Sequence, residues 1–287
     1  ITNELLNTDK CYLIKDDKYN KDQVELAKST LTKKLTRHVK NKNKTKKNID
    51  KFKKKISYQS KINMLTNLFK LLELKDKLPV IVFCFSRKGC ENYCNNLQST
   101  DFLNKTDKSY VKSFINSSLK LLNEYDRELD QIVYVKSLLL RGIGVHHSGL
   151  LPILKEIVEI LFQSGYISVL FATETFAMGV NMPARTVIFS QLKKHDGKQF
   201  RYLLPGEYIQ MAGRAGRRGF DKVGTVILLT WEGIPDLKNI VEGTPLKLIS
   251  QYRLTYQTIL SILQLGQNDE LFNVGNILRG SFGEHNS

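Results

Sequence analysis

Gln210, Arg214 and Arg217 carry side chains that could hold a phosphate chain, and their spacing would bring them together. At about 100° per residue, a helix would align positions i, i+4 and i+7 within roughly 60° of one another. Two guanidinium groups and an amide offer forked N–H donors that suit the oxygens of a triphosphate. Gly213 and Gly216 are too small to block a ligand or a second domain. The alternative is a solvated basic helix, which these glycines would weaken without purpose, so the run indicates a triphosphate site.

A second polar turn follows the apolar stretch Val169–Ala172. Thr173 would place a hydroxyl and a backbone N–H at the edge of a sheet, where such donors suit a nucleic-acid phosphate. Gly179 permits a close approach that a side chain would forbid, and Asn181 can offer a donor and an acceptor to a ribose hydroxyl. The alternative is an ordinary strand–turn–helix joint capped by threonines, which is less consistent with the arginine run downstream.

Two further turns repeat this arrangement. Ser86 and Arg87 follow an apolar stretch and open an expected helix, so a hydroxyl, helix N-terminal amides and a guanidinium could all face phosphate. Alone this pattern is weak evidence, because serine is an ordinary N-cap residue. The run His146–Pro152 forms another polar turn before a helix, and we expect His147 to pack or hydrogen-bond there rather than act as a base.

The elements that must position these side chains alternate between strand and helix. Short apolar runs predict buried parallel strands, and apolar residues at helical spacing predict helices between them. The strands are expected at 79–85, 144–147, 166–172, 185–189 and 224–229, and the helices at 62–72, 87–97, 111–124, 127–141 and 151–163. This alternation predicts an α/β fold with a parallel sheet and helices on both faces. Ligands of such sheets bind beyond the carboxyl ends of the strands, where Ser86, Thr173 and the Gln210 helix should lie.

The chain of 287 residues predicts about two domains, and its net charge of +16 is unevenly distributed. Residues 28–55 hold 12 Lys and Arg37 against Asp50, a net charge of +12, so the rest carries only +4. This segment has few apolar positions, and we expect a basic flexible insertion that either tethers RNA phosphates or has no specific partner. We therefore expect an N-terminal strand or linker over 1–27, the insertion over 28–55, and an α/β domain over 56–232.

Several classes of protein are disfavoured. No apolar run is long enough to span a bilayer, and the first residues do not resemble a secretory signal. The chain does not begin with Met, which suggests a piece of something longer. The four cysteines lack metal-binding spacing and indicate reduced, buried thiols of an intracellular protein, so we expect no metal site.

The polar turns, in this order, resemble motifs IV, IVa, V and VI of exosome-associated DExH-box RNA helicases in superfamily 2. The runs Leu151–Phe162 and Phe171–Pro183 resemble that group rather than helicases at large. The runs Lys194–Glu207 and Gly224–Leu229 look like the branch of cytoplasmic Ski-complex (superkiller) helicases more than its nuclear exosome-adaptor relative. The resemblance extends over about residues 56–287, and 245–287 is similar to part of that family's winged-helix domain.

The resemblance implies a second RecA-like helicase domain. It implies that ATP is contacted by Gln210, Arg214 and Arg217, with the arginines as fingers and with help from Gly179 and Asn181. It implies that the RNA backbone is contacted by Ser86, Thr173 and the turn around Ser148 and Gly149, to which Arg87 adds a charge. Arg218 lies outside the arginine stripe, and we expect it to be structural and to pair with an acid.

One departure from the family limits what the chain can do. It contains no P-loop and no Asp-Glu-x-His, which belong to the first RecA-like domain and would supply the Mg²⁺ ligands. We therefore expect ATP and Mg²⁺ as cofactors of the whole helicase but no ATPase activity of this chain alone.

The resemblance implies a 3′-to-5′ RNA helicase that feeds RNA to the exosome. The expected partners are single-stranded RNA, a first RecA-like domain, and Ski-complex or exosome subunits, without a membrane. The expected localisation is cytoplasmic, with nuclear as the alternative. Two other functions stay open: a helicase acting on DNA or in the spliceosome, and a non-catalytic RNA-binding module.

Overall fold

The computed structural model describes residues 14–15, 18–19, 58–97, 100–179, 181–231, 237–244 and 256–265. The chain divides into two compact units, Ile1–Thr244 and Pro245–Ser287. In the second unit the structure describes one helix, α12 (Tyr256–Leu265). The predicted basic insertion over 28–55 and most of the predicted winged-helix region lie outside the described residues.

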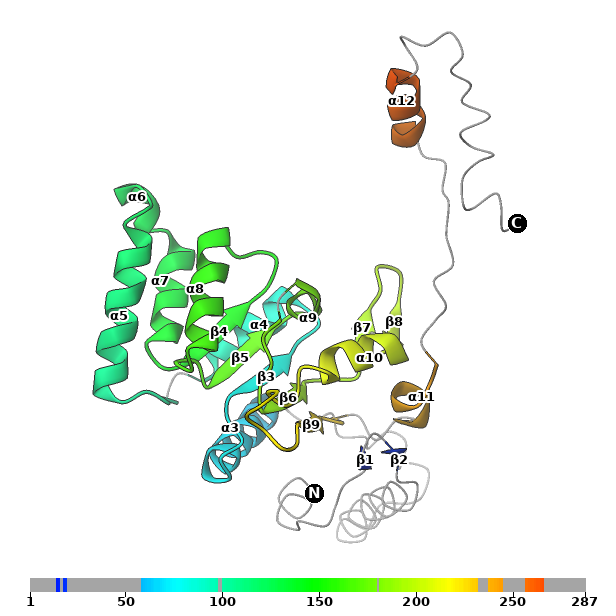
Figure 1. The fold of residues 1–287 in the computed structure, drawn as a ribbon, viewed down its shortest axis with the longest axis horizontal. Helices are drawn as coiled ribbons and strands as arrows, with labels where there is room; N and C mark the ends of the chain where they lie inside the picture. The colour runs from blue at the N-terminus through cyan, green and yellow to red at the C-terminus, as the bar shows by residue number, and fades with distance from the viewer. Residues whose placement is uncertain are drawn as a thin grey trace, which may run out of the picture. The chain divides into compact units, whose positions relative to one another are not determined.

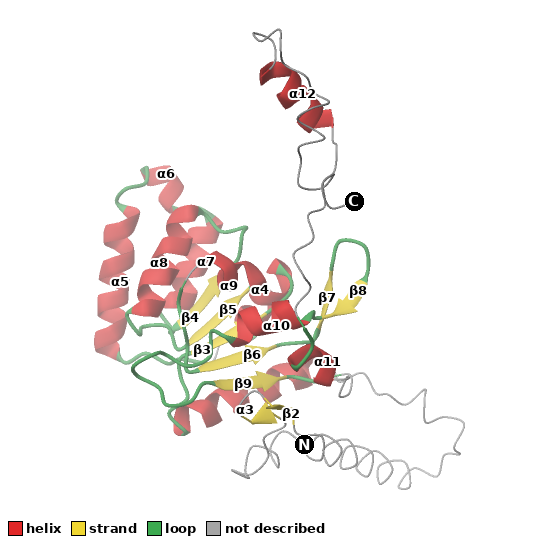
Figure 2. Ribbon diagram, turned by 45° about the vertical axis from the view of Figure 1, so that its right-hand side comes forward, coloured by secondary structure: helices red, strands yellow, loops and turns green. Residues whose placement is uncertain are grey.

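A five-stranded parallel sheet forms the centre of the first unit (Figure 1). Its strands follow the order β4 (Ile143–His146), β5 (Val169–Ala172), β3 (Val80–Phe83), β6 (Thr186–Phe189) and β9 (Thr225–Leu228). All four strand pairs are parallel, and Figure 2 shows the strands side by side with helices around them. Every residue of β3, β5 and β6 is buried, as expected for strands covered by helices on their faces. The predicted α/β class with a parallel sheet is confirmed.

Helices lie around this sheet, and all but the short helix Glu124–Arg127 bury apolar residues. They are α3 (Tyr58–Leu74), α4 (Arg87–Asn95), α5 (Lys105–Leu119), α6 (Glu124–Arg127), α7 (Asp130–Leu139), α8 (Pro152–Gln163), α9 (Glu174–Gly179), α10 (Pro205–Ala212) and α11 (Leu237–Val241). In α3 the predicted stripe of Ile62, Leu65, Phe69 and Leu72 is buried. The ring of Phe69 meets that of Phe171 in β5 edge to face, with centroids 6.1 Å apart. The core thus ties helix to sheet through residues that the helical spacing identifies.

Two small antiparallel pairs lie outside the central sheet. Strand β1 (Ile14–Lys15) pairs with β2 (Lys18–Tyr19) within the segment 1–27, where an N-terminal strand or linker is expected. Strands β7 (Lys193–His195) and β8 (Phe200–Tyr202) form a hairpin that the sequence analysis did not predict. The hairpin projects beside α10 in both ribbon views (Figures 1 and 2). It therefore lies next to the segment that carries the arginine run.

Candidate functional site

The predicted nucleic-acid residues lie together beyond the carboxyl ends of neighbouring strands. Ser86 follows β3, Ser148 follows β4, and Thr173 follows β5 directly. The order β4-β5-β3 makes these three strands adjacent. Three turns far apart in the sequence therefore share one edge of the sheet, as the alternation of strands and helices predicts.

Arg87 links two of these turns. Its Nη2 donates a hydrogen bond of 2.9 Å to Ser148 Oγ, and both side chains are exposed. A Cβ on Gly149 would lie 3.1 Å from Arg87 Cδ and Nη1, so the absence of a side chain leaves room for the guanidinium. Gln131 of α7, which the sequence analysis missed, also holds this turn: it donates to Gly149 O at 3.0 Å and accepts from the Leu151 N–H at 2.8 Å.

The hydroxyl-bearing residues are partly engaged by the chain itself. Ser86 caps α4 by accepting from the Gly89 N–H at 3.0 Å, as an ordinary N-cap does. The Thr173 N–H donates to His146 O at 3.1 Å. The prediction that this N–H could bind phosphate is wrong, because it continues the pairing between neighbouring strands β4 and β5. The Thr173 hydroxyl remains, 2.9 Å from the hydroxyl of Thr175.

A cavity of 620 Å³ adjoins this edge of the sheet, between the end of β4 and helices α8 and α9. It is lined by His146, Ser148, Pro152, Lys155, Glu156, Glu159, Thr175 and Gly179. His146 Nε2 lies 2.7 Å from Glu159 Oε1, yet burial lowers the pKa of His146 more than this carboxylate raises it. The pKa of His147 is also lowered by burial, and its Nδ1 accepts from the Gly149 N–H at 3.1 Å. His147 therefore helps to hold the turn, which agrees with its expected structural role, whereas His146 links the end of β4 to α8.

The arginine run does not form the continuous helix that was predicted. Helix α10 ends at Ala212 and Gly213 is its C-cap, so only Gln210 lies on it, where it is exposed. The prediction that Gln210, Arg214 and Arg217 form one helical stripe is wrong. After the helix the backbone turns to pair with the residues before β6: the Ala184 N–H donates to Arg214 O at 2.9 Å. The Gly216 N–H returns a bond to Ala184 O at 2.7 Å.

Glycines make this turn possible. Gly216 has φ +89°, a left-handed conformation that a side chain disfavours. A Cβ on Gly224 would lie 2.4 Å from Ala215 O, so the two backbone segments approach too closely for any side chain. The glycines therefore serve backbone packing at the start of β6 and β9. The backbone of Arg214 and Arg217 consequently lies near the amino ends of β6 and β9.

Arg214 nevertheless meets the residues expected near the triphosphate. Its Nη1 donates to Asn181 Oδ1 at 3.1 Å, and its Nη2 donates to Ala177 O near the end of α9. Gly179 ends the same helix with no atom within 4 Å of a built Cβ and without a positive φ. The fold within the described residues therefore does not require glycine there, and any close approach would come from a ligand or another domain.

Arg217 is held by an acid that the sequence analysis missed. Its Nε and Nη2 donate to the two carboxylate oxygens of Asp221 at 2.9 and 3.1 Å. Arg185 Nε donates to the same carboxylate at 3.0 Å. The hydrogen bond from Arg217, which outweighs burial, and the charges of both arginines lower the pKa of Asp221 far below its usual range. The expected pairing of Arg218 is wrong: it is exposed and forms no ion pair within the described part of the chain.

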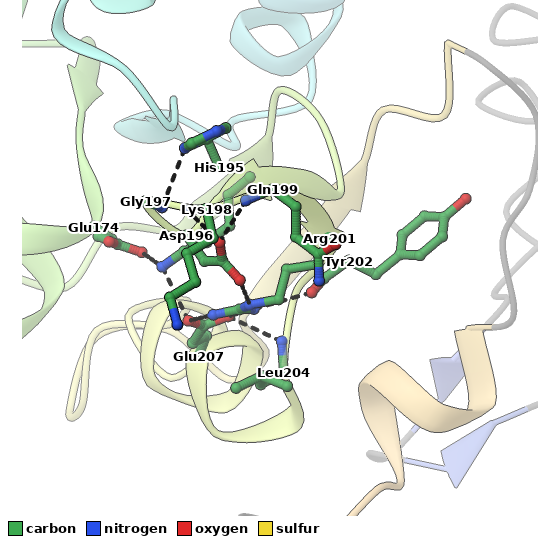
Figure 3. Close-up of polar contacts among 11 residues, drawn as sticks. Glu174, His195, Asp196, Gly197, Lys198, Gln199, Arg201, Tyr202, Leu204 and Glu207 are labelled. Carbon is green, nitrogen blue, oxygen red and sulfur yellow. Dashed lines mark hydrogen bonds and ion pairs between the residues drawn. The ribbon is translucent and has the colours of Figure 1, made fainter.

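A network of charges fixes the start of α10 to the hairpin and to α9 (Figure 3). Arg201 in β8 donates to both oxygens of Glu207 at 2.9 and 2.8 Å, and the Leu204 N–H donates to Glu207 at 2.9 Å. Lys194 in β7 forms ion pairs with Glu207 and with Glu174, the first residue of α9. Burial alone would raise the pKa of Glu207, but these donors outweigh it and lower the pKa to about 2. The network thus joins the start of the helix after Thr173 to the start of α10.

Metal ligands, thiols and membrane-spanning helices can also be assessed in the described residues. Within them, no three His, Cys, Asp or Glu residues are grouped to hold a metal ion. Cys84, Cys90 and Cys94 are free and buried. Burial raises the pKa of the Cys94 thiol well above its usual value. Among the described helices, none combines the length and the apolar character needed to cross a membrane.

Comparison with known proteins shows which family the chain resembles. Residues 110–219 match the family described as Helicase conserved C-terminal domain. The chain is 51% identical over 221 residues to Superkiller complex protein 2 of Mus musculus, covering 76% of this chain and 17% of the relative. It is 50% identical over 217 residues to Antiviral helicase SKI2 of Saccharomyces cerevisiae, covering 75% of this chain and 17% of that protein. It is 48% identical over 205 residues to Exosome RNA helicase MTR4 of Mus musculus, covering 70% of this chain and 20% of that protein. The matched part is therefore about a fifth or less of each relative's length.

Proposed function

Because the chain belongs to the exosome-associated DExH-box RNA helicases of superfamily 2, we propose that it forms the second RecA-like domain of an ATP-dependent RNA helicase. In the complete helicase, meaning this chain joined to a first RecA-like domain, it contacts ATP on one side and the RNA backbone on another. The enzyme moves 3′ to 5′ along RNA and feeds it to the exosome.

One observation carries the proposal: helix α9 connects the two sets of candidate residues. Thr173 directly precedes this helix, and Arg214 donates to the carbonyl of Ala177 near its end. Arg214 also binds Asn181 just beyond it. A change in the position of Arg214 on nucleotide binding would therefore move α9 and, with it, Thr173 directly before the helix, because a short hydrogen-bonded helix moves as one body.

The residues present fit part of a nucleotide site. When bound, ATP with Mg²⁺ supplies the phosphoryl group that hydrolysis removes. Arg214 and Arg217 stabilise the negative charge on that group, and Gln210, Gly179 and Asn181 orient the nucleotide. Gln210, Gly179 and Asn181 are all exposed, so a partner domain can reach them. We propose that the Mg²⁺ ligands come from the first RecA-like domain, as the missing Asp-Glu-x-His motif implies.

The RNA side grips phosphate and sugar. The exposed Ser86, Arg87 and Ser148, with Gly149 and Thr173, present hydroxyls and one guanidinium along a single edge of the sheet. Contacts of this type position a nucleic acid without reading its bases, so little sequence preference is expected. Hydrolysis then shifts this edge along the strand in steps.

The names of the relatives support the proposed partners. They include a superkiller complex protein and an exosome RNA helicase. Single-stranded RNA, the first RecA-like domain, and subunits of a Ski complex or of the exosome are the proposed partners. We place the protein in the cytoplasm, with the nucleus as the alternative.

ATP hydrolysis and duplex unwinding test this function together. The chain alone should hydrolyse no ATP with or without RNA, whereas the complete helicase should show RNA-stimulated hydrolysis. It should unwind an RNA duplex with a 3′ overhang but not one with a 5′ overhang. A matched deoxy-overhang substrate should be unwound more slowly, because it lacks the 2′-OH. RNA-stimulated hydrolysis by the chain alone, or equal unwinding from both ends, would contradict the proposal.

A further inference from the structure

Asp221 lies almost buried between two arginines and saturates its carboxylate with their N–H groups. Its side chain is 9% exposed. Its Oδ2 accepts from the Arg217 backbone N–H and from Arg217 Nε, both at 2.9 Å. Its Oδ1 accepts from Arg217 Nη2 at 3.1 Å and from Arg185 Nε at 3.0 Å. One carboxylate therefore holds both the backbone and the side chain of Arg217.

This arrangement leaves a defined part of the guanidinium free. A guanidinium carries five N–H donors in a fixed plane. Asp221 takes the Nε edge of Arg217, while the opposite edge, with Nη1, makes no hydrogen bond within the described residues. The planar group can therefore bind a second anion only on the side that faces away from Asp221.

The backbone around Arg217 cannot orient this side chain by itself. Arg217 lies outside any helix, between Gly216 with φ +89° and Gly219 with φ +83°. A long arginine side chain in such a turn would sample many rotamers without a partner. Asp221 is therefore the group that selects one of them.

Asp221 is itself fixed from the other side. Arg185, directly before β6, donates to Asp221 and also to the carbonyl of Asp76 at 2.8 Å. Asp76 lies in the turn between α3 and β3, at the amino end of the sheet. Arg185 thus ties Asp221 to the residue before β6 and to the turn before β3, while the orientation of Arg217 depends on its own forked pair with Asp221.

We propose that Asp221 is a positioning residue that presents the free edge of Arg217 to the phosphate chain of the nucleotide. The inference rests on the proposed role of Arg217 in ATP hydrolysis. Asp221 touches no substrate itself. It acts by fixing the guanidinium before the nucleotide arrives, so that no orientation has to be found during the reaction.

Kinetics of the complete helicase test this role through Arg217→Ala, Asp221→Ala, Asp221→Asn and the double variant. Asp221→Ala should lower kcat about 10- to 100-fold, because a guanidinium displaced by about 1 Å loses much of its effect. The KM for ATP and the Kd for RNA should change less than about threefold. The double variant should be no slower than Arg217→Ala, because Asp221 acts only through Arg217. Additive losses in the double variant would overturn the inference.

A matched variant separates positioning from general stability. Arg185→Ala removes the other partner of Asp221 but leaves the forked pair with Arg217 intact. It should lower the Tm about as much as Asp221→Ala but lower kcat clearly less than Asp221→Ala does, because Asp221 still holds Arg217 in the forked pair. If Asp221→Ala does not fold, Asp221→Asn keeps the shape without the charge and should still lower kcat more than Arg185→Ala. Equal losses of kcat in the two variants would mean a purely structural role and would overturn the inference.

A readout without ATP completes the test. In the nitrogen-15-labelled chain, the Arg217 Nε–H resonance should be protected from exchange, and the protection should be lost in Asp221→Asn. Unprotected exchange in the parent chain would overturn the inference. The two proposals also fail differently. Full activity of Arg217→Ala would refute the proposed function, whereas an inactive Arg217→Ala beside a fully active Asp221→Ala would refute the role of Asp221 alone.

Discussion

At the scale of single residues, Arg87 concentrates the charge of the proposed RNA edge. It is exposed, donates to Ser148, and lies over the backbone of Gly149. Its hydrogen bond to Ser148 links the turns that follow β3 and β4, so the two turns present their polar groups side by side. The hydroxyls of Ser86 and Thr173 add neutral donors beside it.

Replacing Arg87 with Ala in the complete helicase should weaken RNA binding about 3- to 10-fold. The slope of log Kd against log salt should fall by about one, because one phosphate contact is lost whatever the sequence. Fluorescence anisotropy with a labelled single-stranded RNA at several salt concentrations measures both quantities. Lys112→Ala, which removes an exposed cation from α5, is the matched control and should change neither. An unchanged salt slope in Arg87→Ala would contradict the RNA edge.

Residue types and spacing predicted the candidate residues but not their partners. Arg217 and Arg218 are adjacent and identical in type, and the sequence analysis expected Arg218 to be the paired one. The structure gives the acid to Arg217 instead, through Asp221 four positions later. Arg217 and Asp221 are four positions apart in the sequence. The sequence analysis interpreted the arginine run as one helix, however, and so it did not predict the turn in which the two side chains meet.

At the scale of elements, the turn between α10 and β9 depends on the contact of Gly224 with Ala215. Gly224→Ala should lower the free energy of unfolding by about 2–3 kcal/mol, because the new Cβ would lie 2.4 Å from Ala215 O and the backbones would have to separate. Urea denaturation of the chain measures this loss. Gly179→Ala is the control, since a Cβ there meets nothing within 4 Å, and it should change stability by less than about 1 kcal/mol. Equal effects of the two substitutions would contradict the described packing.

The network around Glu207 predicts a dependence of stability on pH. The pKa of Glu207 falls from 4.5 to about 2 in the folded chain, so the folded state favours the charged form. Its contribution is therefore fully present above pH 4.5 and is lost as the pH falls toward about 2. Glu207→Gln should lower the free energy of unfolding at pH 7 by about 2 kcal/mol and flatten its decline between these pH values. Denaturation curves across that pH range measure it.

Glu73→Gln is the matched control for Glu207→Gln, because Glu73 is an exposed carboxyl on α3. It should leave the free energy of unfolding at pH 7 unchanged. A slope in Glu207→Gln identical to that of the parent would show that the network with Arg201 and Lys194 contributes nothing to folding.

The central sheet was predictable because its signal is local. Each strand is a short apolar run followed by a polar turn. Every residue of β3, β5 and β6 is buried, so both faces of these strands are apolar and the run stands out in the sequence. The hairpin β7–β8 was not predicted, because its strands are only three residues long and β7 contains no apolar residue. Asp196-Gly197 was the available sign, since Asp-Gly marks tight hairpin turns. The end of α10 was missed because arginine spacing alone cannot reveal that Gly216 adopts a positive φ.

At the scale of the whole molecule, the net charge and the proposed RNA edge belong to different parts of the chain. Residues 28–55 hold a net +12 of the total +16, and they lie outside the described residues. The RNA edge instead depends on a few oriented groups at the end of three strands. The proposed RNA edge therefore does not depend on the segment that carries most of the net charge.

Deleting residues 28–55 from the complete helicase separates these two contributions. We expect the variant to bind RNA more weakly and with a smaller salt slope, but to keep its RNA-stimulated kcat at saturating RNA. Anisotropy titrations beside steady-state hydrolysis measure both. Loss of nearly all RNA affinity would show that the insertion is the tether and that the sheet edge grips little.

The measurement that tests the central claim most directly is RNA-stimulated ATP hydrolysis by the complete helicase carrying Arg217→Ala beside Arg218→Ala. The two arginines are adjacent in the chain, but only Arg217 is held by Asp221. We predict that Arg217→Ala lowers kcat at least about 1,000-fold with RNA affinity preserved, as expected for an arginine finger, and that Arg218→Ala retains most of the activity. An active Arg217→Ala variant, or an equal loss in both, would contradict the assignment of this chain as the half of the ATP site that supplies the arginines.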